Sequence, residues 1–183
     1  MSSDAFAQAW EYTGTAEGGY SDNPNDSGGP TNHGITQKVA RAHGYTGDMR
    51  DLTPEIALEI AKKEYWDVLS LDGVAEVSVE LAQELFDTGF NAGTRKAGTF
   101  LQRSLNALNR RGKEYDDIVV DGAPGEKTLN ALRAYAAKRK VEGLHVLLVL
   151  LNSLQGAFYL ELTERREKDE EFLYGWIKNR VVI

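Results

Sequence analysis

The segment EGGYSDNPNDSGGPTNHGIT, residues 17–36, is the most informative part of this chain. Glu17 directly follows a predicted first helix, and a loop rich in Gly, Asn, Asp and Pro comes next. That loop carries carboxylates at Asp22 and Asp26 and ends in the pattern GGxTxxGIT. Because glycines allow positive φ and tight folding, the loop can hold polar side chains beside a cleft, at fixed distances from Glu17. We therefore expect the chemistry of the protein in this segment.

The composition is that of an ordinary folded protein, with 183 residues, of which 42% are hydrophobic and 9% aromatic. This length fits one domain, or two small subdomains that share a core. The chain contains no cysteine, which excludes a disulfide framework, a thiol nucleophile and a Cys-based zinc site.

Several helix starts can be predicted from capping residues. Asp4 can cap a first helix, and Thr53-Pro54 combines an N-cap threonine with proline at the first helical position. A further helix is expected from about Ser78 to Gly93, followed by one that Thr94 caps.

The second half of the chain is also predicted to be helical. A loop over 112–125 could hold one short strand at 118–120, and a helix around 129–136 is expected to end at Gly143. The segment 144–167 is apolar nearly all round at first, so we expect a buried central helix. The whole pattern predicts an α-helical bundle-like domain, to which a short β-hairpin can be added.

Charge is distributed unevenly along the chain. Residues 1–93 carry 5 Lys/Arg against 16 Asp/Glu, a net charge of −11, whereas residues 94–140 carry 11 against 5, a net charge of +6. The basic segment is either a set of solvated helix faces or a surface that meets an anionic polymer or membrane. Nucleic acid is not expected as a partner, because no nucleic-acid-binding motif is present and the whole chain is acidic.

Common catalytic signatures are missing from the sequence. The three histidines form no HExxH pair, and no GxSxG, SxxK or GxxxxGK[ST] motif occurs. The DNPNDSGG stretch fails as a calcium loop, because Pro24, Ser27 and His33 occupy positions that need other residues. We therefore expect neither a metal nor an organic cofactor, and carboxylate chemistry remains. Hydrolysis of a glycosidic bond needs a protonated acid such as a partly buried Glu, although Glu17 could equally be a solvated residue at a helix end.

At this point the residues resemble a known family. The chain resembles glycoside hydrolase family 108 in six segments. They are EGGYSDNPNDSGGPTNHGIT (17–36), KKEYWDVL (62–69), LFDTGFNAG (85–93), LQRSLN (101–106), VDGAPGEKTLNAL (120–132) and GWIKNR (175–180). This resemblance implies a mainly α, lysozyme-like fold that cleaves the bond between N-acetylmuramic acid and N-acetylglucosamine in peptidoglycan. It also implies a lysozyme-like catalytic region over 1–93 and a helical peptidoglycan-binding region over 94–183, packed as one compact unit.

The resemblance further implies roles for individual residues. Glu17 matches the general acid of the family, and Asp26 could act as a base, orient a water, or cap the loop. Tyr20, Thr31, Thr36 and Asn91 are candidates for binding substrate. Three of them have an alternative: a core contact for Tyr20, a helix cap for Thr36, and a helix C-cap for Asn91.

Two rival functions stay open, a lytic transglycosylase and a catalytically idle peptidoglycan-binding or regulatory protein. The first residues, MSSDAFAQAWEY, do not resemble a secretory signal. We therefore expect synthesis in the bacterial cytoplasm and action on the cell wall in the periplasm after release, with a holin or another export partner as the route. The longest apolar run, 146–151, is too short for stable membrane insertion, and a monomer is expected.

Overall fold

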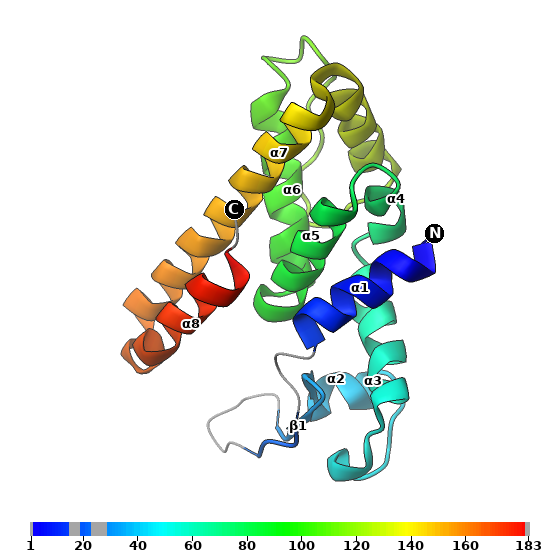
Figure 1. Cartoon of the computed structure of the whole chain (residues 1–183), viewed down its shortest axis with the longest axis vertical. Helices are drawn as coiled ribbons and strands as arrows, with labels where there is room; N and C mark the ends of the chain where they lie inside the picture. The colour runs from blue at the N-terminus through cyan, green and yellow to red at the C-terminus, as the bar shows by residue number, and fades with distance from the viewer. Residues whose placement is uncertain (1, 15–18, 23–28, 182–183) are drawn as a thin grey trace.

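The computed structural model describes residues 2–14, 19–22 and 29–181, and Glu17 and Asp26 therefore lie outside the described residues. The chain is mainly α-helical, with one two-stranded antiparallel sheet (Figure 1). The helices are α1 (Ser2–Gly14), α2 (Gln37–Ala42), α3 (Pro54–Ala61), α4 (Leu71–Ala75), α5 (Val79–Ala92), α6 (Thr94–Leu108), α7 (Glu126–Arg165) and α8 (Glu170–Arg180). The strands are β1 (Thr31–Asn32) and β2 (Ile35–Thr36), and the short helical segments are η2 (Met49–Asp51), η3 (Lys62–Asp67) and η4 (Glu167–Asp169).

Two of the predicted helix starts are confirmed by their caps. The Thr53 hydroxyl accepts the Ile56 N–H at 3.4 Å, and the Ser78 hydroxyl accepts the Leu81 N–H at 3.2 Å. The prediction for Thr94 is wrong by one residue. Gly93, with a φ of 93°, is the N-cap of α6, and Thr94 is the first helical residue.

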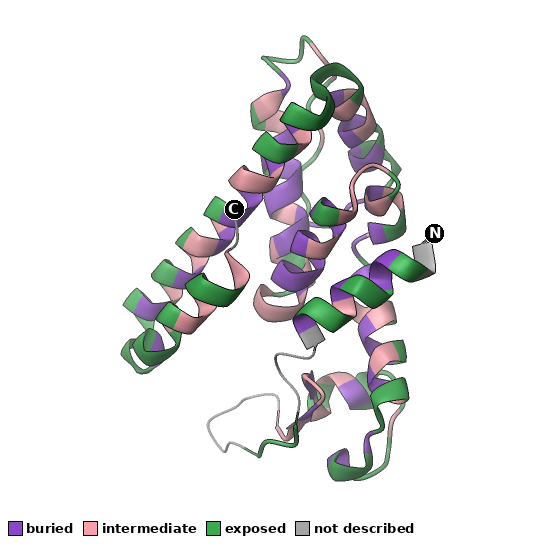
Figure 2. Ribbon diagram, in the orientation of Figure 1, coloured by how far each residue is buried: buried purple, intermediate pink, exposed green. Residues whose placement is uncertain are grey.

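The core is built around α5, which packs against α1, α4, α6 and α7. Aromatic rings form its centre: Phe6 from α1 meets the rings of Trp66 and Phe86 edge to face, at centroid distances of 5.4 and 5.8 Å. All three side chains are buried, as Figure 2 shows for the inner faces of these helices. Trp66 and Phe86 therefore belong to the core.

The predicted strand at 118–120 does not form. The side chain of Asn106 on α6 takes the place of a partner strand: its amide donates to the Ile118 carbonyl at 2.7 Å and its oxygen accepts the Ile118 N–H at 2.9 Å. One side chain therefore satisfies the backbone of Ile118, and the segment stays a loop.

The motif DGAPG, residues 121–125, has a structural role in joining α6 to α7. Gln102 on α6 donates to Asp121 Oδ1 and accepts the Gly122 N–H, both at 2.8 Å. The loop lies so close to α6 that a methyl group at Gly98 would overlap the Gly122 carbonyl and approach Pro124 Cδ to 2.8 Å. Glycine at position 98 is what permits this contact.

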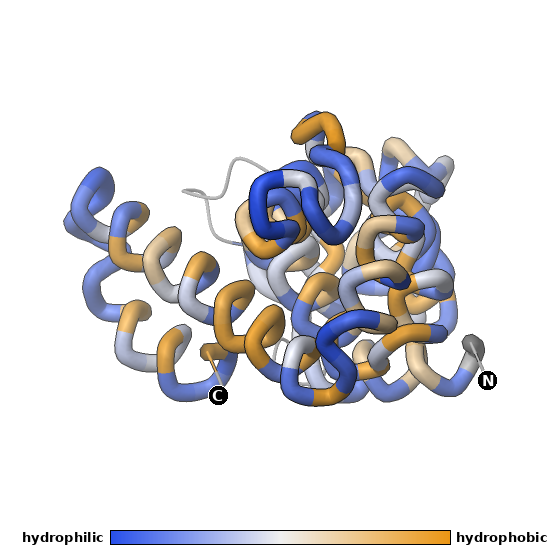
Figure 3. The backbone as a smooth tube through the Cα atoms, turned by 90° about the horizontal axis from the view of Figure 1, so that it is seen from above, coloured by the Kyte–Doolittle hydropathy of each residue, from blue (hydrophilic) through white to orange (hydrophobic). Residues whose placement is uncertain are grey.

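Helix α7 differs from the prediction in two ways. The chain turns sharply at Lys140, which has a φ of 58° and a ψ of −152°, rather than ending a helix at Gly143 (Figure 1). The second half is also not a central helix, because Val141, Val146 and Leu160 are exposed. It packs with α8 as a helical pair at one side of the molecule, and Figure 3 shows hydrophobic residues along this pair.

By length and composition, α7 could span a membrane, and it is the one helix of the described chain that could. Its most apolar 18-residue window has a mean hydropathy of 1.5, and one third of that window is buried in the structure. Core helices of soluble proteins pass the same test. Here the helix also packs against α5, α6 and α8.

Candidate active site

The loop that follows the first helix ends in a β-hairpin, as the sequence allowed. Thr31 pairs with Thr36 and Asn32 with Ile35. The two-residue turn between the strands, His33-Gly34, has φ values of 49° and 73°, and positive φ at both positions is typical of type I′ hairpins. The GGxTxxGIT pattern therefore encodes a tight turn that brings the two threonines side by side.

The hairpin also receives the chain that comes from α1. The backbones of Ser21 and Thr31 exchange two hydrogen bonds of 2.8 Å, and the Asn32 side chain donates to the Met49 carbonyl at 2.8 Å. These bonds place Tyr20 next to the hairpin. Its ring lies 4.8 Å from the guanidinium carbon of Arg50 and is 37% exposed, so Tyr20 is not the core contact that was its alternative.

The two threonines have different surroundings. The Thr36 hydroxyl accepts the Val39 N–H at 3.3 Å and is the N-cap of α2. The Thr31 hydroxyl is buried and has no hydrogen-bond partner among the described residues. The Thr36 hydroxyl is therefore engaged in capping α2, whereas the Thr31 hydroxyl makes no hydrogen bond within the described part of the chain.

Asn91 lies apart from the hairpin, at the end of α5. Its amide donates to the backbone carbonyl of Asp87 at 2.9 Å and to Asp87 Oδ1 at 3.1 Å. The nitrogen of this side chain is thus committed within α5. A substrate contact through Asn91 stays a prediction, as do the roles of Tyr20, Thr31 and Thr36.

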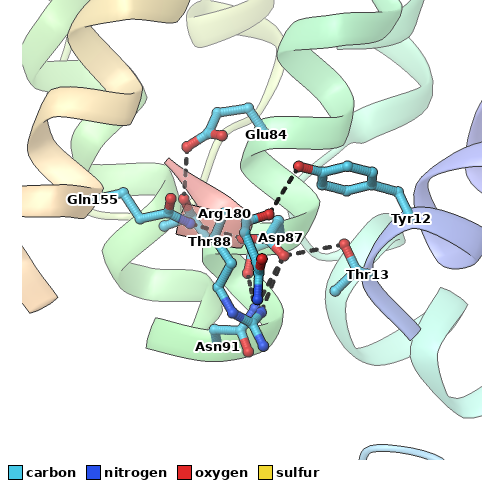
Figure 4. A network of polar contacts seen from close by, with 9 residues as sticks. Tyr12, Thr13, Glu84, Asp87, Thr88, Asn91, Gln155 and Arg180 are labelled. Atoms are coloured by element: carbon cyan, nitrogen blue, oxygen red, sulfur yellow. Dashed lines mark hydrogen bonds and ion pairs between the residues drawn. The ribbon is translucent and has the colours of Figure 1, made fainter. Parts of the chain in front are cut away.

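A buried polar network around Asp87 was not predicted from the sequence (Figure 4). Asp87 is 2% exposed. Its two carboxylate oxygens accept hydrogen bonds from Thr13 at the end of α1, Asn91 on α5, Gln155 on α7 and Arg180 on α8, at 2.8 to 3.2 Å. Burial raises the pKa of Asp87, and Arg180 and the hydrogen bonds oppose that rise.

Glu84 lies one turn before Asp87 on α5, and its carboxyl is also buried. Burial, with a smaller contribution from the charge of Asp87, raises its pKa to about 8. The Thr88 hydroxyl donates to Glu84 Oε1 at 3.1 Å and opposes this rise. Glu84 is therefore protonated near neutral pH, and it is a buried acid directly before the LFDTGFNAG motif.

Metal ligands do not gather anywhere in the described part of the chain. Within residues 2–14, 19–22 and 29–181, no group of three His, Asp or Glu side chains could hold an ion. The arrangement instead offers carboxyls, hydroxyls and an aromatic ring around the end of α1 and the hairpin, which are groups suited to acid chemistry on a neutral, hydroxyl-rich substrate.

Comparisons with known proteins agree with this chemistry. Residues 10–93 match the family described as glycosyl hydrolase 108, and residues 96–181 match the family described as predicted peptidoglycan domain. SagA of Brucella abortus has a similar solved structure, with a TM-score of 0.70 and 26% sequence identity over 98% of this chain and 90% of that one. The search of curated proteins found no match.

The fold and these matches define a class of protein, a glycosidase with a mainly α, lysozyme-like fold that acts on peptidoglycan. The first half of the chain, residues 10–93, matches glycoside hydrolase family 108, and the second half, residues 96–181, matches the predicted peptidoglycan domain family.

Proposed function

We propose that this protein is a lysozyme-type N-acetylmuramidase, which hydrolyses the bond between N-acetylmuramic acid and N-acetylglucosamine. The observation that carries the proposal is the position of Glu17. It lies in the EGGY motif, inside the segment that matches a glycosidase family, and a peptidoglycan domain family matches the rest of the chain. A glutamate that can donate a proton is the one group that this reaction cannot lack.

In the proposed reaction Glu17 is the general acid. It donates its proton to the glycosidic oxygen as the bond from that oxygen to C1 of the muramic acid breaks. A water oxygen then bonds to C1, and the proton that this water loses goes to a carboxylate. Asp26 is the second carboxyl of the loop and either accepts that proton or orients the water.

The described residues supply the surroundings of this reaction. Tyr20 offers a partly exposed ring beside the hairpin, and the Thr31 hydroxyl, which is buried and has no hydrogen-bond partner in the described part of the chain, is the group proposed to bind the attacking water. These side chains are held by backbone pairing between Ser21 and Thr31, so little rearrangement is needed for them to meet substrate.

Replacement of Glu17 tests the proposal. Glu17→Gln keeps the shape of the side chain but cannot donate a carboxyl proton, so lysis of purified cell walls should fall by about 100-fold or more. Glu59→Gln, which changes an exposed glutamate on α3, is the matched control and should lyse like the wild type. Lysis by Glu17→Gln at the wild-type rate would refute the assignment.

Mass spectrometry of the released fragments identifies the reaction. Hydrolysis leaves a reducing N-acetylmuramic acid, whereas a lytic transglycosylase leaves an anhydro end. A product with the anhydro end would replace the proposed reaction by the transglycosylase reaction.

We also propose that the protein acts as an endolysin of the phage type, which reaches the cell wall through a holin or another export partner. The support is the location of the substrate, since peptidoglycan lies outside the inner membrane. Expression with and without a pore-forming holin tests this. Lysis that depends on the holin is expected, and equal lysis in its absence would contradict the dependence.

A further inference from the structure

A cavity of about 280 Å³ lies between the end of α1, the Asp87 turn of α5 and one face of α8. Residues from both matched segments line it: those from α1 and α5 lie in the segment that matches the glycosidase family, and those from α8 lie in the segment that matches the peptidoglycan domain family. The Tyr12 hydroxyl, in the wall formed by α1, donates to the Asn179 carbonyl of α8 at 3.1 Å. The cavity is smaller than the roughly 300–1,000 Å³ of drug-sized sites, so it suits one ring of a chain.

The α8 wall of this cavity is aromatic. Phe172, Trp176 and Asn179 follow each other at spacings of four and three residues, so they share one helix face. The rings of Phe172 and Trp176 stack at a centroid distance of 5.9 Å, and Trp176 packs on Tyr159 at 5.1 Å. Phe172 is nevertheless 50% exposed, and Tyr12 on the opposite wall is 51% exposed. Rigid aromatic faces are thus presented to solvent from both sides.

Polar groups with free bonding capacity complete the lining. The Asn179 side-chain amide and the Glu171 carboxylate make no hydrogen bond or ion pair with other residues of the described chain. The charge of Arg180 faces Asp87, 3.2 Å away. The positive charge of Arg180 and the negative charge of Asp87 offset each other. Glu171 therefore leaves the residues that line the cavity with a net negative charge.

These features select the chemistry of the ligand. Aromatic faces bind apolar ring surfaces and side-chain amides bind hydroxyl or N-acetyl groups, which together suit a neutral amino sugar. A nucleic acid or another polyanion is disfavoured, because electrostatic complementarity requires excess positive charge. Tyr12 and Thr13 lie five and four residues before Glu17 in the sequence, so the cavity adjoins the chain segment that leads to the proposed acid.

We propose that the cavity between α1 and α8 is an additional sugar-binding site for the glycan strand of peptidoglycan. This proposal rests on the proposed function for the identity of the polymer. The site lets the second half of the chain retain a long strand, and it favours polymeric substrate over short fragments.

Co-sedimentation with purified peptidoglycan sacculi tests the proposal, with all variants made in the full chain that also carries Glu17→Gln. Phe172→Ala and Asn179→Ala should each weaken binding about five- to tenfold, the size expected for losing one contact in an interface. Tyr174→Ala is the matched control. It removes an aromatic ring from the same helix that is 78% exposed and does not line the cavity, so it should bind like the parent.

A thermal melt of each variant shows that the fold is intact, and Asn179→Ala keeps the test decisive if Phe172→Ala unfolds. A chitin oligosaccharide, which is a neutral chain of N-acetylglucosamine without stem peptides, should compete with sacculi for the site, because the site is assigned to a neutral amino sugar. Unchanged binding by both variants, equal weakening by Tyr174→Ala, no competition by the chitin oligosaccharide, or binding that salt abolishes would each overturn the proposal.

The two proposals fail separately. Wild-type lysis by Glu17→Gln would refute the catalytic assignment and leave the binding result standing. Loss of lysis by Glu17→Gln together with unchanged binding by Phe172→Ala and Asn179→Ala would refute the additional site alone.

Discussion

The guanidinium of Arg180 lies 3.2 Å from the carboxylate of Asp87, and this ion pair connects the last helix of the chain to the central helix α5. Both side chains are largely buried. Asp87 belongs to the segment that matches the glycosidase family and Arg180 to the segment that matches the peptidoglycan domain family. The two segments are therefore held together by a charged contact in their interior as well as by apolar packing.

Asp87→Asn should destabilise the protein by about 3 kcal/mol, since removal of one member of a buried pair costs far more than the loss of an exposed one. In wild type, Thr13 and Gln155 donate to different oxygens of the Asp87 carboxylate. Asparagine has only one side-chain oxygen, so one of these two donors would lose its acceptor. Denaturant unfolding measures the change. Arg165→Ala, which removes the exposed pair with Glu161, is the control and should change stability by less than about 1 kcal/mol. Equal effects of the two substitutions would contradict the role of the buried pair.

Stability should fall as pH rises from about 5 to 8, because of Glu84. Its folded pKa of about 8 lies above the ordinary value of 4.5, so the folded state holds a proton that the unfolded state releases across this range. The contribution is fully present below the unfolded pKa and is lost as pH approaches the folded pKa. Asp87, whose pKa burial also raises, acts in the same direction.

Glu84→Gln isolates this effect, since glutamine keeps the size of the side chain and does not titrate. The difference in unfolding free energy between wild type and variant should change by a few kcal/mol between pH 5 and pH 8, in favour of the variant at the higher pH. Unfolding curves across that range provide the measurement. A constant difference would show that Glu84 is not held protonated in the folded state.

Much of the fold could be predicted from sequence because its signals are local. Ser78 caps the helix that begins at Val79, and the GGxTxxGIT pattern contains the positive-φ turn at His33-Gly34. Such features depend on neighbours along the chain, which the sequence displays directly.

The features that could not be predicted depend on residues that are distant in the sequence. Asp87 accepts hydrogen bonds from Gln155 and Arg180, which lie 68 and 93 residues away in the sequence. Its sequence context does not distinguish it from a solvated aspartate. The apolar pattern of α7 predicted a central helix. It could not show that the turn at Lys140 sends the second half outward to pair with α8.

Gly98→Ala should destabilise the protein by roughly 1–3 kcal/mol, the usual range for a group forced into a packed site. The new methyl group would overlap the backbone of Gly122, which cannot move without breaking its bond to Gln102. Gly156→Ala is the matched control in a helix. Its methyl group would meet only side chains at 3.6 Å or more, so it should stabilise by about 0.5–1 kcal/mol through helix propensity. Thermal melts that show the same sign for both would contradict the close contact of the 121–125 loop with α6.

Thr31→Val and Thr36→Val should have opposite effects, although the two residues face each other in the hairpin. The Thr31 hydroxyl is buried without a partner in the described chain, so its removal should cost no stability or even increase it. If that hydroxyl binds the attacking water or a sugar, kcat on cell-wall substrate should fall. Thr36 caps α2, and loss of a cap costs about 1 kcal/mol, while its effect on kcat should be smaller. Denaturant unfolding and turbidity kinetics on both variants measure the two quantities. A drop in stability without loss of activity for Thr31→Val would assign that hydroxyl to the fold and remove it from the reaction.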